Sequence, residues 1–295
     1  MSEEPMVTAI IVSYRVRELL LATLRSLYAN TEVPLQVVVV DNASDDGSVE
    51  AVHEEFPLVN LIPQRENLGF GRGNNIGLHE AVGRFVLLLN PDVEIGPGCV
   101  DALTDFLLVH PEAGAVGPRL ARPSGKLDLA ARRGFPTPST SFYRFTGLSR
   151  VFAHSRRFNG YNMGHQSVDK VHEIDAGTAA CLLVRRTAID QVGFFDPDFF
   201  MYGEDLDLCY RLKAGGWKTY YLPAAHAIHV KGASSRQATA RSLYAFHSAM
   251  WTFHHKHYAS NLPAFANGLI WASIWGRWAA LRVRAGITED PRVSR

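Results

Sequence analysis

The chain has 295 residues, of which 47% are hydrophobic and 20% are charged, a composition typical of folded globular proteins that argues against disorder. The formal net charge is +1 and no long run of like charge occurs, which excludes a bulk attraction to nucleic acid. We therefore expect no nucleic-acid partner.

The N-terminal residues carry Glu3 and Glu4 and lead directly into an apolar segment, so they lack the basic and apolar regions of a secretory signal. The cysteines are three in number, widely spaced, and contain no CxxC pair: Cys99, Cys181 and Cys209. This pattern argues against a disulfide framework and a structural zinc site. We expect buried thiols and a cytoplasmic location.

The first third of the chain alternates apolar, β-branched segments with segments of helical periodicity. Strands are predicted at residues 7–12, 35–40, 59–62 and 85–89, and helices at 17–29, 48–55 and about 73–81. This alternation predicts an α/β fold with a doubly wound, mostly parallel sheet and helices on both faces. Ligands of such sheets bind beyond the carboxyl ends of the strands. The polar residues expected to meet there are Ser13, Tyr14, Asp41, Asn42, Asn90 and Asp92.

Residues 119–173 lose this periodicity and fill with Pro, Gly, Ser, Arg and aromatic residues, which predicts long loops over the sheet. Loops of this length are usually functional or disordered. Regular elements return with a strand at 180–184, a helix that opens near Glu204 and a strand at 219–222.

The last 60 residues hold eight Lys or Arg against two Asp or Glu, together with four of the five Trp. We expect a first domain at 1–235 and a helical, Trp/Arg-rich extension at 236–295. Within residues 262–284 the apolar run is shorter than the roughly 20 residues that span a bilayer. Two interpretations stay open: a peripheral membrane anchor, or a helix docked on the core or on a second subunit of a homodimer. The residues concerned are Phe265, Leu269, Trp271, Ile274, Trp275, Trp278, Leu281, Arg282 and Arg284.

Asp41 belongs to a polar run that is either a tight turn or a site where a carboxylate accepts the ring N–H of uracil or thymine. Residues 67–77 place four glycines within nine residues, which is either a turn before a helix or a loop that approaches a diphosphate. Neither G-x-G-x-x-G after the first strand nor a P-loop is present. Candidate ligand contacts in this segment are Asn67, Gly69, Arg72 and Asn74.

An apolar strand is followed by Asn90, Pro91 and Asp92. These residues are either a β-turn or a site where Asp92 binds Mg²⁺ or Mn²⁺, and both interpretations can hold at once. Glu204 and Asp205 open a helix. Acidic residues there complement the helix dipole, yet one of the two is also a candidate general base.

For two other polar residues of this part, Asp207 and His229, the sequence favours a structural role. Asp207 and Arg211 are spaced i, i+4, which predicts a structural ion pair. His229 lies three residues after His226, and a lone histidine in a chain with 12 of them is usually not a ligand.

Taken in order, these motifs resemble family 2 glycosyltransferases of the GT-A fold, and in particular their rhamnosyltransferase-like branch. The matching segments lie between residues 7 and 235: 11–14, 40–48, 67–77, 90–92, 177–186, 192–196, 202–207, 214–217 and His229. The resemblance implies transfer of a sugar, L-rhamnose as the first expectation, with inversion. The donor would be a dTDP- or UDP-linked sugar, and the acceptor a hydroxyl of a glycan or a lipid-linked cell-wall or polysaccharide precursor.

The resemblance also implies residue roles. Asp41 would contact the base, Asp92 would bind metal and diphosphate, Asp205 would be the catalytic base, and His229 would complete the shell of a divalent cation. Where the family commonly has two Asp flanking one residue, this chain begins the motif with Asn90, and Ala176 stands where relatives often carry an aromatic residue.

Other interpretations remain open at this point. They are a nucleotidyltransferase, which would release pyrophosphate, and a non-catalytic sugar-nucleotide-binding relative. If the resemblance holds, residues 119–173 would face the acceptor, because the donor contacts are assigned elsewhere. The cytoplasmic protein would attach peripherally to the inner face of the cell membrane, near its lipid-linked acceptor.

Overall fold

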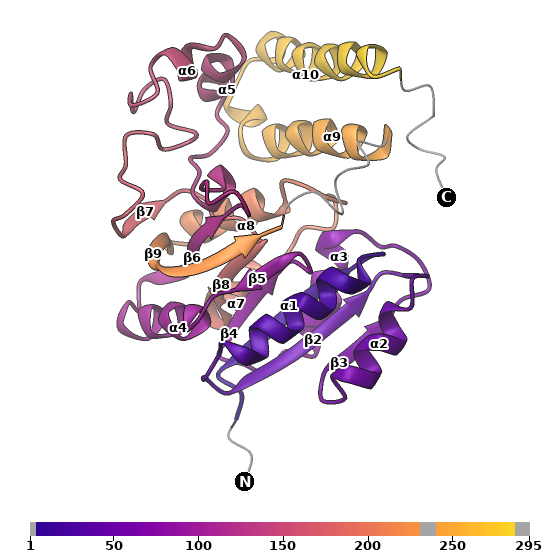
Figure 1. Cartoon of the computed structure of the whole chain (residues 1–295). Coiled ribbons are helices and arrows are strands. Elements are labelled where there is room, and N and C mark those ends of the chain that lie inside the picture. The colour runs from indigo at the N-terminus through magenta and orange to yellow at the C-terminus, as the bar shows by residue number, and fades with distance from the viewer. Residues whose placement is uncertain (1–3, 231–239, 287–295) are drawn as a thin grey trace.

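The computed structural model describes residues 4–230 and 240–286 (Figure 1). In its first third, four strands pair in parallel in the order β3-β2-β1-β4, with one helix between successive strands. The alternation predicted from the sequence is confirmed, with shifts of one to three residues at β3 and α3. The elements are β1 (Val7–Ser13), α1 (Arg17–Ala29), β2 (Leu35–Asp41), α2 (Ser48–Glu55), β3 (Asn60–Pro63), α3 (Phe70–His79) and β4 (Phe85–Leu89).

The strand β8 (Cys181–Arg185) reverses the direction of the sheet, because it runs antiparallel between β4 and β6 (Ala113–Ala121). Beyond β6 lies β9 (Lys218–His229), parallel to β6 and longer than the predicted strand at 219–222. Antiparallel to β9 are β5 (Val93–Ile95) and β7 (His172–Ile174). The result is a nine-stranded sheet in the order β3-β2-β1-β4-β8-β6-β9-β5, with β7 also on β9.

The predicted irregular region at 119–173 is interrupted by three short helical segments, η1 (Leu129–Ala131), α5 (Pro138–Phe145) and α6 (Leu148–Val151). Short connections join these segments, and a long irregular segment at 152–171 then leads to β7. The remaining helices are α4 (Cys99–Val109), α7 (Arg186–Val192), α8 (Glu204–Ala214), α9 (Ala240–His257), η2 (Ala259–Asn261) and α10 (Ala264–Arg284).

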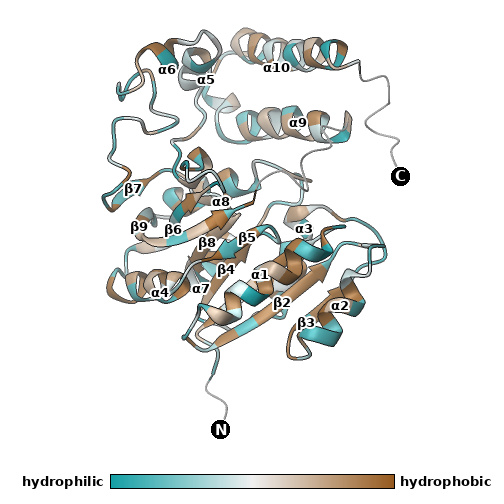
Figure 2. Cartoon of the chain, in the orientation of Figure 1, coloured by the Kyte–Doolittle hydropathy of each residue, from teal (hydrophilic) through white to brown (hydrophobic). Residues whose placement is uncertain are grey.

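Helices cover both faces of the sheet, and alternate strand residues therefore bury into two cores. Ile11 and its neighbours pack with α1, α2 and α4, whereas Ile10 and Leu88 pack with α7 and α8. Figure 2 shows the strands as largely hydrophobic, as burial on both faces requires. The three cysteines are free and buried, as predicted.

Helices α9 and α10 lie beyond the sheet, beside α5 and α6 (Figure 1). Phe253 and Ala249 of α9 pack against Phe199, which lies in the loop before α8. The predicted domain boundary between residues 235 and 236 falls outside the described residues. In the part of the chain that the structure describes, no helix has the length and apolar character to cross a membrane.

The apolar residues predicted along α10 divide between two faces. Trp275 and Trp278 contact the ring of Tyr244 on α9, with ring centroids 5.4 and 6.2 Å apart, and Ile274 is buried. Phe265, Leu269 and Trp271 are exposed. One face of this helix therefore packs on α9, and the other remains at the surface.

Candidate functional site

The carboxyl ends of three neighbouring strands bring predicted donor residues together. Ser13 ends β1 and lies in register with Asp41, which ends β2. Leu89, the last residue of β4, lies in register with Ile11 of β1, two residues before Ser13. Asn90 follows Leu89 directly. Parallel pairing thus places Ser13, Asp41 and Asn90 along one edge of the sheet, as the doubly wound topology predicts.

Several buried oxygen atoms at this edge have no hydrogen-bond partner among the described residues. They are Ser13 Oγ, Asp41 Oδ1, Asn42 Oδ1, Asn74 Oδ1 and Asn90 Oδ1, and all five belong to predicted donor residues. A buried polar atom without a partner costs about 1–3 kcal/mol. Such a group of unsatisfied acceptors suits a ligand that supplies N–H or O–H donors, as a nucleobase and a sugar do. Tyr14 lies at the surface near this edge, with the guanidinium of Arg15 over its ring at 5.1 Å.

The glycine-rich segment differs from its predicted form. Helix α3 begins at Phe70, whose N–H donates to the Phe200 carbonyl, so that most of these glycines lie inside the helix. A Cβ at Gly73 would approach Val12 at 2.8 Å, and one at Gly77 would approach Ile10 at 2.5 Å. The expectation that these glycines bring backbone to a ligand is therefore corrected for these two positions, where they let the helix pack closely on the sheet.

The start of α3 nevertheless lies beside the strand ends. Asn67 accepts a hydrogen bond from the N–H of Gly69, and the Asn42 amide donates to the Gly69 carbonyl at 3.1 Å. Arg72 is exposed in the first turn and Asn74 is buried. The donor roles of these residues stay predictions.

The structure brings Asp92 and His229 together, as the family resemblance implied. Strand β5 pairs Val93 with His229, and the Val230 N–H donates to the Asp92 carbonyl at 2.8 Å. As a result, Asp92 Oδ1 lies 3.2 Å from His229 Nε2, and both side chains are buried. Asp128, which the sequence reading missed, lies on the other side of the imidazole, with its Oδ2 3.2 Å from Nδ1.

The donor set of this pair fits a divalent cation that is also bound by substrate. A carboxylate, an imidazole and the unsatisfied oxygen of the nearby Asn90 are oxygen and nitrogen ligands. Cations such as Mg²⁺ typically combine one or two carboxylates with phosphate oxygens of the substrate. Within the described ranges, no group of three or more His, Cys, Asp or Glu side chains forms a complete protein cage for a metal.

Asp205 and Glu204 open α8 and are both buried. Asp205 Oδ2 lies 2.6 Å from Nη2 of Arg133, a buried guanidinium that also donates to the Gly177 carbonyl. Burial acts against the charge of Arg133, but Asp205 outweighs it and raises the pKa of the guanidinium above its usual range. Sequence reading missed Arg133, since nothing near it in the chain marks it as a partner of α8.

Glu204 differs from its neighbour in charge state. Its burial, reinforced by the charge of Asp205, raises the pKa of Glu204 to about 8. At neutral pH Glu204 therefore holds a proton, and Glu204 Oε2 has no hydrogen-bond partner within the described part of the chain. Of the two candidates, Asp205 is the carboxylate suited to accept a proton.

A short series of contacts connects Asp205 to the strand ends. The N–H of Asn90 donates to the Ala180 carbonyl at 2.9 Å, and Cys181 of β8 lies in register with Leu89 of β4. Residues just before β8, including Gly177, thus lie at the same edge as Asn90. The guanidinium of Arg133 donates both to the Gly177 carbonyl and to the Asp205 carboxylate.

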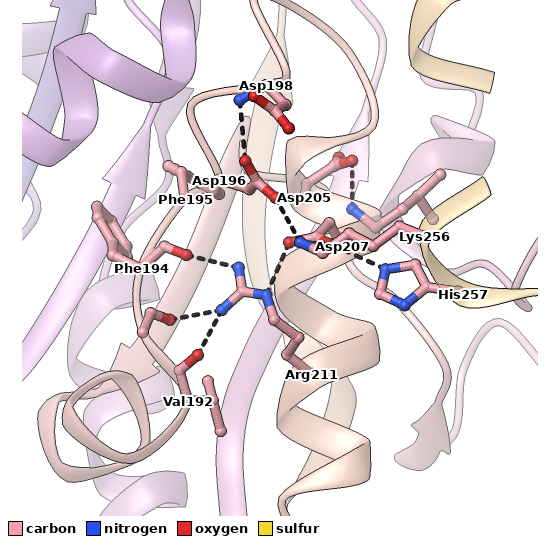
Figure 3. Close-up of polar contacts among 12 residues, drawn as sticks. Val192, Phe194, Phe195, Asp196, Asp198, Asp205, Asp207, Arg211, Lys256 and His257 are labelled. Carbon is pink, nitrogen blue, oxygen red and sulfur yellow. Dashed lines mark hydrogen bonds and ion pairs between the residues drawn. The ribbon is translucent and has the colours of Figure 1, made fainter. Parts of the chain in front are cut away.

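Asp207 has the structural role predicted from its spacing, within a larger cluster (Figure 3). It lies 2.7 Å from Arg211, which also donates to the carbonyl of Val192 at the end of α7 and to that of Phe194 in the loop before α8. From α9, Lys256 and His257 each lie 2.8 Å from its Oδ1. This Asp207 cluster, which comprises Asp207, Arg211, Lys256 and His257, fixes α9 to the helix that carries Asp205.

Comparison with known proteins agrees with this geometry. Residues 5–245 match the model of the family described as glycosyltransferase like family 2. A protein of Mycobacterium tuberculosis named N-acetylglucosaminyl-diphospho-decaprenol L-rhamnosyltransferase is 36% identical over 244 residues, 78% of each chain. Rhamnosyltransferase WbbL of Escherichia coli K12 is 29% identical, covering 76% of this chain and 83% of its own.

Among solved structures, a mannosyltransferase from Pyrobaculum calidifontis in complex with GDP-Man and Mn²⁺ superimposes with a TM-score of 0.56. It is 18% identical and the match covers 96% of this chain and 81% of that one, which supports the predicted GT-A fold. The family match, the rhamnosyltransferase relatives and the arrangement of strand ends agree. The chain belongs to glycosyltransferase family 2 and is a glycosyltransferase.

Proposed function

We propose that the protein transfers L-rhamnose, with inversion, from a dTDP- or UDP-linked donor to a hydroxyl of a lipid-linked glycan precursor. The observation that supports the reaction class is the sheet edge at which Asp41 and Asn90 end neighbouring strands. Asp92, which pairs with His229, follows Asn90 in the chain, and Asp205, at the start of α8, binds Arg133. The sugar and the lipid-linked acceptor are inferred from the name of the M. tuberculosis relative.

In this proposal each residue has one task. Asp41 accepts the ring N–H of the base, and Asn42, Asn74 and Arg72 line the path of the sugar diphosphate. Asp92 and His229 would hold Mg²⁺ or Mn²⁺, which when bound offsets the charge of the leaving diphosphate. Asp205 takes the proton of the acceptor hydroxyl. Inversion follows because the hydroxyl attacks the anomeric carbon from the face opposite the leaving group.

The reaction is tested with purified protein, dTDP-rhamnose, Mn²⁺ and a short-chain prenyl diphosphate GlcNAc acceptor. We expect dTDP release that depends on the acceptor, together with a rhamnosylated product whose anomeric configuration is opposite to that of the donor. Release of pyrophosphate would instead indicate a nucleotidyltransferase. A panel of sugar nucleotides should identify the donor, because a ligand at about 100 times its Kd stabilises the fold by roughly 2.7 kcal/mol.

Asp128 provides a second test, since a carboxylate on the far nitrogen orients a metal-binding imidazole and increases its basicity. Asp128→Asn keeps an oxygen that can accept from the Ala130 N–H, as Asp128 Oδ1 does at 3.2 Å, while it removes the charge beside His229. We expect the affinity for Mn²⁺ in the presence of dTDP, measured by electron paramagnetic resonance of free Mn²⁺, to fall about 10- to 100-fold.

The matched control for this test is Asp169→Asn, which removes an exposed ion pair with Arg119 in the same region. Its Mn²⁺ affinity should match that of the wild type. Unchanged affinity in Asp128→Asn, with the fold intact, would remove Asp128 from the support of His229.

The remaining parts of the chain have proposed roles as well. Residues 119–173 would face the acceptor, so that exchange of this region with a relative would change the acceptor and leave the donor unchanged. The extension at 236–295 would hold the enzyme peripherally at the inner face of the cell membrane, or join two copies. The exposed face of α10 supports a surface role.

A further inference from the structure

The acidic residues of this chain are distributed very unevenly, which the net charge of +1 conceals. The sequence contains no Asp or Glu between Asp128 and Asp169, and none between Asp207 and Glu289. The first of these segments nevertheless carries six Arg, and the second carries ten Lys or Arg. Four helices of these segments, α5, α6, α9 and α10, lie beyond the sheet (Figure 1), whereas the second segment also contains most of α8 and the strand β9, with three of its ten basic residues.

These two segments are also neighbours in the fold. Figure 1 draws α5 beside α10, and the pKa of Arg277 on α10 is lowered first by burial and then by the charge of Arg144 on α5. Close basic groups repel one another, and a surface that gathers them favours an anionic partner.

Exposed apolar side chains occur between the basic ones on both segments. On α5 and α6 and directly after them, Phe142, Val151 and Phe152 are between 47% and 74% exposed. On α10, Phe265, Leu269 and Trp271 are between 50% and 73% exposed. Exposed Arg144, Arg150, Arg156 and Arg157 accompany the first group, and Arg284 follows the second. Aromatic and apolar side chains flanked by Arg, without acidic residues, are the composition of surfaces that insert into a lipid headgroup layer.

We propose that α5–α6 and α10 together form one docking face for an anionic lipid bilayer, in which α10 is only half of the contact. This inference builds on the proposed function, because it supplies the surface that would bring a lipid-linked acceptor to the site. It also assigns residues 138–158 to the bilayer. The Asp207 cluster fixes α9, and through it α10, to the helix that carries Asp205, so the catalytic edge is held in a constant position relative to the bilayer (Figure 3).

The inference is tested by flotation of the full chain with vesicles of phosphatidylcholine alone or with phosphatidylglycerol added. We expect flotation only with the anionic vesicles, and weaker flotation as salt increases. The triple variants Phe142→Ser/Val151→Ser/Phe152→Ser and Phe265→Ser/Leu269→Ser/Trp271→Ser should each lower the partition coefficient by tenfold or more. Removal of one Arg, in Arg144→Gln, should lower it roughly fivefold.

The control is Leu58→Ser/Val82→Ser, which removes two exposed apolar side chains from the β-sheet domain, outside the helices of the docking face. It should float as the wild type does. Thermal unfolding checks that every variant is folded. If the α5–α6 variant floats like the wild type while the α10 variant does not, the two-part face is wrong. Equal flotation with neutral vesicles, or stronger binding to a DNA duplex than to anionic vesicles, would also overturn it.

Transfer to a short-chain, water-soluble acceptor separates this inference from the proposed function. Loss of flotation with this transfer retained is expected of both triple variants. A wild-type protein that transfers rhamnose to the soluble acceptor but never floats would disprove the docking face alone. A protein that floats but transfers nothing would instead contradict the proposed function.

Discussion

Asp205→Asn is expected to lower kcat by about 10²- to 10⁴-fold, which is the usual contribution of a positioned general base. The loss should fall on turnover, because the asparagine keeps one oxygen that can accept from Arg133, whose Nη2 lies 2.6 Å from Asp205 Oδ2 in the native protein. Binding of dTDP-rhamnose with Mn²⁺, followed by thermal shift, should remain close to that of the wild type. Steady-state transfer assays at saturating donor measure the effect.

Glu204→Gln tests whether Glu204, rather than Asp205, is the general base. Burial raises the pKa of Glu204 to about 8, so the native side chain is already neutral at pH 7 and the glutamine resembles it. We therefore expect a much smaller loss of turnover in Glu204→Gln than in Asp205→Asn. The reverse order, with Glu204→Gln the weaker enzyme, would transfer the role of base to Glu204.

Asp207→Asn is expected to lower the free energy of unfolding by about 3–5 kcal/mol, the cost of leaving buried charges without their partner. Asp207 is fully buried and lies within 2.8 Å of Arg211, Lys256 and His257. Removal of its charge leaves Arg211 of α8 and His257 of α9 without their carboxylate, while Lys256 keeps its ion pair with Asp196. Urea unfolding followed by circular dichroism measures the change.

The matched control for Asp207 is Asp190→Asn, which breaks another i, i+4 pair with Arg186 at 3.1 Å, where the carboxylate is exposed. An exposed pair contributes about 0–1 kcal/mol. If the two variants lose the same stability, the Asp207 cluster does not anchor α9.

The pH dependence of stability gives an independent measurement of the same cluster. Burial alone would favour the neutral acid, but His257, Lys256 and Arg211 outweigh it and lower the pKa of Asp207 from 3.8 to about 2. A depressed carboxyl pKa contributes stability that is complete above the unfolded value and is lost as the pH falls through the folded value. The wild type should therefore lose about 2 kcal/mol between about pH 4 and pH 2 from this group, a loss absent in Asp207→Asn.

Local sequence patterns determined the parallel half of the sheet and its polar edge. Apolar runs, rich in β-branched residues in β1 and β2, predicted β1, β2 and β4, because strands buried on both faces are nearly continuously apolar. Since parallel strands end at the same edge, Ser13, Asp41 and Asn90 could be placed together without coordinates. The ion pair of Asp207 with Arg211 could also be predicted from the sequence, because the two residues are spaced i, i+4, about one helical turn.

Tertiary structure alone decided the partners that these residues meet. Arg133 and Asp128 lie in a segment without periodicity, and they reach Asp205 and His229 only through the folding of loops over the sheet. Helix α3 begins at Phe70, before the predicted position, and the N–H of Phe70 donates to the carbonyl of Phe200, which is far away in the chain. Hydrophobicity marked the apolar residues of α10, but packing against α9 determined which of them were buried. Contacts between distant segments depend on how whole elements pack, and no local period encodes that.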